Sequence, residues 1–362
     1  MPSPMQAILA PELRPYFLDN LRAFAPLHVL WGRRVYMKGV DERSDYPELT
    51  FQQVSPVKSF IDGWKLRTPR LVVPEPFWYR QYPTSFPFLL GFRLGCLVRR
   101  SSAKVGTYCI DNSFPEKLLK LPARIPAPIR ARLAKLVAAP YLAMIDDIVF
   151  GTDGSRETYS RTFGKSFDQF PTVIPRPVRY GERTQPIDRK RFAFVGSLRR
   201  EKGIGLMLAA WDEVSKRRDD LSLEVAGIGE LAPQVREWAK LHPSVTFTEG
   251  ATRNEVFELL NRTGCHIQLS MPGARFREQV GSSNLEALSC EHRLVVTEET
   301  GIANWLRTLG HGVLPINASP SDVADLIEKF ADDDDWEAPE ATFGEVDGYV
   351  EAHDLLLERA GK

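Results

Sequence analysis

The stretch PGARFREQVGSSNLEALSC, residues 272–290, decides the fold of this 362-residue chain. The apolar run CHIQLS precedes it at 265–270, and the apolar run LVVT follows it at 294–297. The pattern predicts a buried strand, a loop, a short helix that begins near Ser282, and a second strand. Glu278 and Glu286 therefore lie across a junction between loop and helix at the end of a strand. In alternating α/β domains ligands bind outside the carboxyl ends of the strands, and the first N–H groups of a helix can hold a phosphate.

The same residues also have a purely structural interpretation. Ser283 and Glu286 have the spacing of a capping box, in which the glutamate only reaches back to the cap. Gly281 would then do no more than ease a turn. The rest of the second half of the chain is needed to choose between the two interpretations.

Strands and helices alternate regularly through residues 190–335. Apolar runs at 191–195, 221–226, 245–248, 265–270, 294–297 and 313–316 predict six strands. Such alternation is typical of a doubly wound parallel sheet, whose strands all end at the same edge. Successive loops at this edge carry Lys202, then Gly227 and Gly229, then Thr252, and finally Glu278 and Glu286, and we expect the edge to bring these residues together.

The first half of the chain also begins with the order strand, helix, strand. Residues 6–10 and 27–31 read as strands and residues 14–24 as a helix, and further strands are expected at 70–74, 104–110 and 171–175. Residues 11–15, PELRP, stand where a dinucleotide-binding fold has its Gly-rich loop, so that kind of site is disfavoured here.

The polar, proline-containing residues 176–190 are the expected linker between two domains. We expect a first domain at 1–180 and a second at 190–335, with a C-terminal helix at 345–362 that can pack back on the first domain. The run of aspartates at 332–335 is expected to be a solvated tail.

Composition excludes several classes of protein. Lys plus Arg and Asp plus Glu both total 47, so no basic excess argues for binding nucleic acid. The four cysteines form no metal-type pair, and buried free thiols in a reducing compartment are expected. The chain starts without the features of a signal peptide, and no apolar stretch is long enough to span a bilayer. A cytoplasmic protein is expected.

Local charge is less even than the total. Residues 86–135 place arginines, among them Arg99, Arg100, Arg130 and Arg132, in an apolar background. A basic amphipathic surface can lie on the anionic inner face of a membrane. The alternative is the solvated face of core helices, whose long side chains cover apolar surface. Three prolines between residues 121 and 128 interrupt any long helix there.

The expected edge of the second domain suits a nucleoside diphosphate. A cationic Lys202 and a helix N-terminus at Ser282 and Ser283 can stabilise the charge of a departing diphosphate. Glu286, one turn into the helix, can accept two hydrogen bonds from a ribose diol. Glu278 can face the next group along, such as a sugar hydroxyl.

With these residues in place, residues 191–330 resemble the donor domain of retaining glycosyltransferases of family four, which have the two-domain GT-B fold. The family signature of two glutamates separated by seven residues matches Glu278 and Glu286. The family's strand and Gly-x-Leu-x-x-x-Lys-Gly loop matches VGSLRREKG at 195–203, and its Gly-x-Gly matches Gly227 and Gly229. The first half resembles the family only in general organisation.

The resemblance implies two Rossmann-like parallel-sheet domains that face a cleft and close over it. It implies that Glu286 holds the ribose, that Glu278 and the backbone of 279–283 approach the donor sugar, and that Lys202 binds the diphosphate. Glu278 is then a candidate catalytic residue, and the candidate donor-binding residues are Gly196, Arg199, Lys202, Gly227, Gly229, Thr252, Gly281, Ser282, Ser283 and Glu286. The loop 250–252 would lie near the base. The donor would be a nucleotide sugar used with retention of configuration, without a cofactor or an obligatory metal. The acceptor would be a sugar or lipid-linked molecule of a surface polysaccharide or glycolipid pathway.

The chain departs from the family at three places. Ser197 stands where the family has Arg, with Arg199 or Arg200 as the substitutes, and residues 291–293 replace a Gly-x-Pro. Asp111 stands where the family often has a His, so it is the candidate catalytic residue on the acceptor side, or else a plain turn residue. The departures at Ser197 and Asp111 keep one alternative open, a non-catalytic protein that binds a nucleotide sugar or a partner protein. A second alternative is an epimerase or phosphorylase on the same fold.

Overall fold

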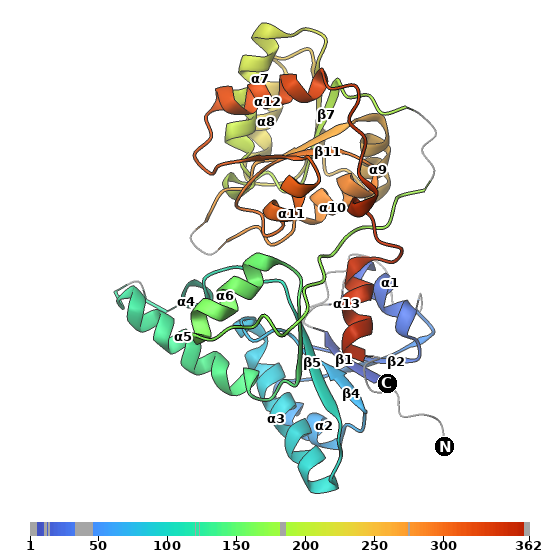
Figure 1. Cartoon of the computed structure of the whole chain (residues 1–362), viewed down its shortest axis with the longest axis vertical. Helices are drawn as coiled ribbons and strands as arrows, with labels where there is room; N and C mark the ends of the chain where they lie inside the picture. The colour runs from blue at the N-terminus through green and yellow to red at the C-terminus, as the bar shows by residue number, and fades with distance from the viewer. Residues whose placement is uncertain are drawn as a thin grey trace. The chain divides into compact units, whose positions relative to one another are not determined.

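The computed structural model describes residues 6–10, 13, 15–32, 46–119, 121–122, 124–181, 186–273 and 276–357. Most of the PELRP loop, and Ala274 and Arg275 of the 272–290 stretch, lie outside these ranges. The chain forms two compact units (Figure 1). Unit 1 consists of Met1–Pro175 and Asp347–Lys362, and unit 2 is Arg176–Val346. The expected parallel sheet is present in both units, each with six strands and flanking helices.

The sheet of unit 1 reverses its strand order near the middle. The order is β3-β2-β1-β4-β5-β6, with every neighbouring pair parallel. The strands are β1 (Gln6–Ala10), β2 (Leu27–Trp31), β3 (Leu49–Gln53), β4 (Arg70–Val72), β5 (Lys104–Cys109) and β6 (Asp147–Phe150). The helices are α1 (Pro15–Leu21), α2 (Ser59–Lys65), α3 (Tyr82–Arg99), α4 (Pro115–Leu118), α5 (Ala127–Leu142), α6 (Asp153–Phe163) and α13 (Gly348–Leu357), with short 3-10 turns at Arg22–Phe24 and Tyr79–Gln81.

Two parts of unit 1 differ from the sequence prediction. The strand expected at 171–175 is wrong: only a single bridge joins Thr172 to Phe150. Proline at both ends of that segment removes two of its backbone donors, so it cannot continue a ladder. The edge strand β3 was not predicted, because its residues are largely polar and its outer side chains are exposed.

Helix α13 closes unit 1 although it lies at the end of the chain. Its apolar residues Ala352, Leu356 and Leu357 are buried in the same core as Ile8 and Val72. It is also hydrogen-bonded to the sheet at two carbonyl groups, where the Leu356 oxygen accepts from Arg70 Nη1 at 3.0 Å and the Leu357 oxygen accepts from Gln6 Nε2 at 2.9 Å. The chain therefore returns to its first unit after completing the second.

The sheet of unit 2 has the same reversed topology. The order is β12-β11-β10-β7-β8-β9, again all parallel. The strands are β7 (Arg191–Val195), β8 (Ser222–Gly227), β9 (Val245–Glu249), β10 (Cys265–Gln268), β11 (Arg293–Thr297) and β12 (Gly312–Leu314). The helices are α7 (Ile204–Arg217), α8 (Ala232–Ala239), α9 (Arg253–Arg262), α10 (Ser282–Ser289), α11 (Ala303–Thr308) and α12 (Pro320–Ala331), with 3-10 turns at Arg200–Lys202 and Glu340–Thr342.

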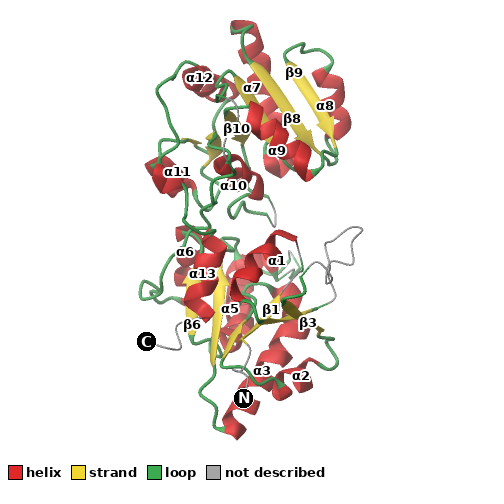
Figure 2. Cartoon of the chain, turned by 90° about the vertical axis from the view of Figure 1, so that its right-hand side faces the viewer, coloured by secondary structure: helices red, strands yellow, loops and turns green. Residues whose placement is uncertain are grey.

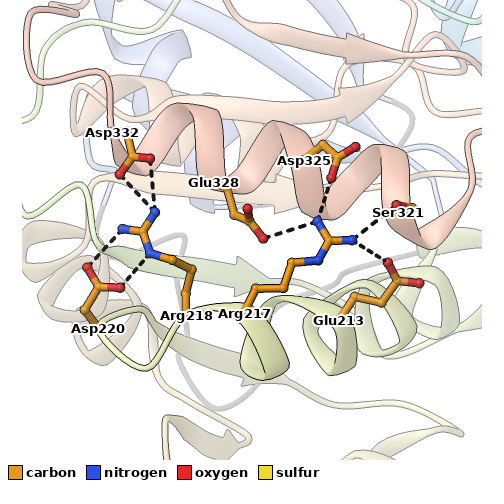
Figure 3. A network of polar contacts seen from close by, with 8 residues as sticks. All are labelled: Glu213, Arg217, Arg218, Asp220, Ser321, Asp325, Glu328 and Asp332. Carbon is orange, nitrogen blue, oxygen red and sulfur yellow. Dashed lines mark hydrogen bonds and ion pairs between the residues drawn. The ribbon is translucent and has the colours of Figure 1, made fainter.

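Helices α7 and α12 pack side by side on this sheet, with Trp211 and Phe330 in its core (Figure 2). Their outer edges are joined by a charged network that Figure 3 shows. In it Arg217 contacts Asp325 and Glu328 of α12, and Arg218 contacts Asp332. Each such exposed pair contributes little alone, but several together fix the register of the two helices.

The same network reaches the acidic run at 332–335. Asp332 accepts from Arg218 at 3.0 Å, and Asp333 accepts from Arg293 at 2.6 Å. The Arg293 guanidinium holds the pKa of Asp333 below its usual range. Two of the four aspartates are therefore paired with basic residues that are distant in the sequence, and Asp332, Asp334 and Asp335 are exposed to solvent, as predicted.

Candidate functional site

A buried carboxylate, that of Glu278, lies at the centre of the candidate site. Its Oε2 atom is 2.5 Å from Lys202 Nζ, and it accepts hydrogen bonds from Ser270 Oγ at 2.8 Å and Gln268 Nε2 at 2.9 Å. Glu278 is only 5% exposed. These three donors stabilise the charged carboxylate in a buried place, where an unpaired carboxylate would cost much free energy.

The topology explains why Lys202 and Glu278 meet. Lys202 ends the short turn that follows β7, and Glu278 lies in the loop that follows β10. β7 and β10 are neighbours at the point where the strand order reverses. Loops diverge at such a switch point, and ligands of doubly wound sheets bind there.

Gln268 connects the carboxylate to helix α10. It ends β10 and is 2% exposed, with its amide nitrogen on Glu278 and its Oε1 accepting from Ser283 Oγ at 2.8 Å. Sequence reasoning missed this residue. The available signal was a polar side chain at the end of a buried strand.

Helix α10 begins at Ser282 as predicted, but without a capping box. Its N-cap is Gly281, and no side chain caps it, because Ser283 bonds Gln268 instead of the helix backbone. The capping-box interpretation of Ser283 and Glu286 is therefore wrong. Gly281 has φ +81, and a Cβ on it would lie 2.7 Å from Asn284 Nδ2, so only glycine fits. The first turn of α10 is thus available for an anion.

Glu286 lies on α10, half-buried and near the first residue of α9. Burial raises the pKa of Glu286, and the nearby Arg253 guanidinium opposes that rise. Thr252 caps α9 in a reciprocal capping box with Glu255. The predicted ribose-binding carboxylate therefore lies on the side of the site where α9 begins, directly after the loop predicted to lie near the base.

The loops that follow β7 and β8 pack backbone against backbone. A Cβ on Gly227 would lie 1.9 Å from the Gly196 oxygen, so a larger residue would force the loops apart. Ile228, next to Gly227, is nevertheless 62% exposed, and its Cγ2 approaches Gly250 of the β9 loop. This exposed apolar side chain is a second residue that sequence reasoning missed.

The remaining predicted residues lie at the same edge. Gly229 packs over the Leu198 backbone. Arg199 and Ser282 are exposed, whereas Ser283 is buried. The structure thus brings the sequence-predicted residues of unit 2 to the ends of β7, β8, β9 and β10. Gln268 connects Glu278 to Ser283, and Ser270 also donates to Glu278.

In unit 1, Asp111 follows β5 and forms a turn. Its Oδ1 accepts the Ser113 N–H at 2.8 Å, and its own N–H donates to Glu75 at 3.2 Å. Glu75 follows β4, at the switch point of this sheet, and is 3% exposed. Burial, and then the charge of Asp111, raise the pKa of Glu75 well above its usual range, and the Tyr159 hydroxyl donates to it. Glu75 was missed, although an acidic residue between two prolines in an apolar run was a visible signal.

Other expectations from composition can be compared with the structure. All four cysteines are buried and free, as predicted. In the described ranges no three His, Cys, Asp or Glu side chains are grouped so as to hold a metal ion. Within those same ranges, every helix is too short or too polar to cross a bilayer.

Comparison with known proteins gives the family of unit 2. Residues 182–342 match the model of the family described as "Glycosyl transferases group 1". Unit 2 is a group 1 glycosyltransferase domain. With its two parallel-sheet units, the chain is a glycosyltransferase of the GT-B fold. No curated protein sequence matches the chain significantly.

Solved structures of this GT-B glycosyltransferase fold resemble the whole chain. Anabaena Alr3699/HepE in complex with UDP and glucose has a TM-score of 0.64 at 11% identity, covering 99% of this chain and 100% of that one. WaaG, a glycosyltransferase involved in lipopolysaccharide biosynthesis, has 0.58 at 12% identity, covering 99% and 100%. The trehalose 6-phosphate synthase of Burkholderia multivorans has 0.60 at 12% identity, covering 99% and 95%. At these identities the likeness concerns the fold.

Proposed function

We propose that this GT-B glycosyltransferase transfers a sugar, with retention of anomeric configuration, from a nucleoside-diphosphate sugar to an acceptor. The observation that carries the proposal is the cluster of Lys202, Glu278 and the uncapped start of α10 at the switch point of unit 2. A cation and helix N–H groups suit a diphosphate, and a carboxylate held by three donors suits the hydroxyl groups of the donor sugar.

The roles of the individual residues follow from this arrangement. Lys202 and the first turn of α10 would bind the diphosphate and stabilise its charge as the bond to the sugar breaks. Glu286 would accept hydrogen bonds from the ribose, with the base near Thr252. The Lys202 ammonium and the helix end supply fixed positive charge, so we propose that no metal is required. Treatment with EDTA should then leave donor hydrolysis unchanged, and a loss that Mg²⁺ restores would contradict this part.

Asp111 is proposed as the acceptor-side carboxylate, because it follows β5 next to the switch point of unit 1. The proposed acceptor is a sugar or lipid-linked molecule of a surface polysaccharide or glycolipid pathway. The lipopolysaccharide role of WaaG supports that proposal by analogy of fold alone. A cytoplasmic enzyme with peripheral contact at the inner face of a membrane fits such an acceptor.

The first experiment is calorimetric binding of a panel of nucleoside diphosphates and nucleotide sugars to wild type and Glu286→Ala. UDP and UDP-glucose come first, because structures of Alr3699/HepE contain them. Loss of a charged hydrogen bond should weaken binding by about 1.5–3 kcal/mol. No binding by the wild type, or equal binding by the variant, would overturn the assignment.

Hydrolysis of the bound donor, measured in the same samples, then tests catalysis. A transferase is expected to release free sugar and nucleoside diphosphate slowly in the absence of an acceptor. Binding without hydrolysis or transfer would instead favour a non-catalytic protein that binds a nucleotide sugar.

A further inference from the structure

The outer surface of α2 and α3 in unit 1 exposes an unusual amount of apolar side chain. Val57 is 91% exposed and Leu97 is 74% exposed. Soluble monomers seldom leave a large contiguous apolar patch in water unless it binds something. We call the following residues the α2–α3 ridge: Val57, Phe60, Ile61, Trp64, Leu90, Leu94, Leu97 and Val98.

Close packing of the two helices holds this ridge together. A Cβ on Gly63 of α2 would lie 2.0 Å from the Phe88 oxygen, and one on Gly91 of α3 would lie 2.1 Å from the Phe60 oxygen. The two backbones are therefore in direct contact, and α2 and α3 run side by side (Figures 1 and 2). Their exposed side chains move as one surface rather than as two separate helices.

Helical periodicity places the apolar rows on the side away from the sheet. On α3 the face with Phe88, Phe92 and Cys96 is buried against the sheet, and Gly91 faces α2. The row of Leu90, Leu94 and Leu97 lies on the remaining side. On α2 the buried residues are Ser59 and Gly63, which leaves Phe60, Ile61 and Trp64 outward.

The ridge also has an aromatic pair of the kind found at membrane interfaces. The rings of Phe60 and Trp64 are stacked, with centroids 6.4 Å apart and planes at 22°. Trp64 remains 37% exposed. Tryptophan combines a large apolar ring with a polar N–H group, and it is enriched where lipid tails meet headgroups.

The charges around the ridge identify its partner. Lys58, Lys65, Arg67 and Arg100 are exposed. Between residues 57 and 100 the acidic residues are Asp62 and Glu75, and Glu75 is buried. Two copies of this surface would bring like charges together, which disfavours a dimer through the ridge. Anionic headgroups would instead neutralise the cations while the apolar side chains enter the lipid.

We propose that the α2–α3 ridge docks on a membrane that contains anionic lipid. This inference rests on the peripheral contact proposed above and deepens it by naming the surface. The sequence analysis placed Arg99 on the basic surface that would contact the membrane. In the structure the Arg99 guanidinium instead donates to the Trp64 and Leu66 oxygens at 2.6 and 3.0 Å. Arg99 thus joins α3 to the end of α2, and the lysines of α2 are the better candidates for headgroup contacts.

The test is flotation of the full chain with vesicles of phosphatidylglycerol and phosphatidylcholine, compared with vesicles of phosphatidylcholine alone. The variant Ile61→Ser/Leu97→Ser/Val98→Ser removes exposed apolar side chains and should not disturb the core. Since the transfer of each apolar side chain from water into lipid favours binding, the variant should lose about tenfold or more in partitioning to anionic vesicles. Leu241→Ser in unit 2, where Leu241 is 77% exposed, is the matched control and should bind like wild type.

A second measurement places the ridge in the lipid directly. Brominated lipid tails should quench part of the tryptophan fluorescence of the wild type, and Trp64→Phe should abolish that part while vesicle binding persists. Equal vesicle binding by the triple variant, or quenching that is unchanged in Trp64→Phe, would overturn the inference.

The remaining outcomes separate this surface from its rivals. If vesicle binding is lost only in the variant Arg130→Ser/Arg132→Ser, the membrane contact lies on α5 and the ridge inference fails. The ridge inference also fails if the wild type binds neither kind of vesicle, or if it forms a dimer and the triple variant is a monomer. Neither result bears on the proposal of sugar transfer, because the nucleotide-binding experiment tests that proposal separately.

Discussion

Lys202 and Glu278 neutralise each other across the switch point of unit 2, with 2.5 Å between ammonium and carboxylate. The side chains are 19% and 7% exposed, so water screens the pair only weakly. A diphosphate that binds Lys202 must therefore share or replace its contact with Glu278. The proposed donor site thus contains an ion pair whose rearrangement is part of donor binding.

Removing only the cation of this pair should destabilise the fold. Lys202→Ala removes the ammonium from a buried carboxylate that keeps its hydrogen bonds from Ser270 and Gln268. Breaking a buried pair costs about 3 kcal/mol or more. Adding Glu278→Gln to that variant should recover much of the loss, because no uncompensated charge remains. Urea unfolding measures this cycle, with the exposed Lys216→Ala as control. A double variant as unstable as Lys202→Ala would contradict the coupling.

Glu286→Gln should stabilise the protein while weakening nucleotide binding. Burial raises the pKa of Glu286, so the folded state holds its proton more tightly than the unfolded state. Stability is then lost as pH rises from the ordinary glutamate pKa through the raised one, and the full cost is present at neutral pH. The neutral glutamine removes this cost.

The check is thermal unfolding from pH 4 to pH 8, alongside nucleoside-diphosphate titration at neutral pH. The melting temperature of Glu286→Gln should exceed that of wild type only at the upper end of the range. Affinity should fall about tenfold with the lost charged hydrogen bond. Glu258→Gln, an exposed carboxylate on α9, should change neither quantity. A lower melting temperature for Glu286→Gln at pH 8 would refute the prediction.

Ile228→Ser should weaken binding of nucleoside diphosphates but not of pyrophosphate. Ile228 lies in the loop that follows β8, beside Gly250 of the β9 loop. Its apolar side chain is exposed there, so a flat base could cover it. Loss of that contact should raise the dissociation constant about tenfold. Competition titrations with both ligands make the comparison, with Leu241→Ser as control. An equal effect on both ligands would indicate that the loop, rather than the base contact, was disturbed.

Asp111→Asn separates a catalytic from a structural role. Asparagine keeps an oxygen that can accept the Ser113 N–H, so the turn and the melting temperature should be preserved. Transfer to the acceptor should fall about 100-fold or more if the carboxylate assists the acceptor hydroxyl. Donor hydrolysis and the affinity for nucleotide should not change. Unaltered transfer would leave Asp111 as a turn residue.

Much of this architecture could be predicted from residue patterns. The alternation through residues 191–330 predicts the sheet of unit 2, and most of its strands agree within one or two residues, because buried parallel strands are continuous apolar runs. The edge strand β3 and helix α2 were not predicted, since an edge strand has polar residues and α2 is short and apolar on its outer side.

The sequence by itself determined which residues stand at strand ends: Lys202 after β7, Gly227 at the end of β8, and Glu278 after β10. Only the tertiary structure decided which of them touch. Spacing cannot tell that Ser283 bonds Gln268 rather than capping its own helix, or that Glu278 pairs with a lysine 76 residues away. Strand order sets these contacts, and the ridge on α2 and α3 likewise depends on which helix faces were left without a partner.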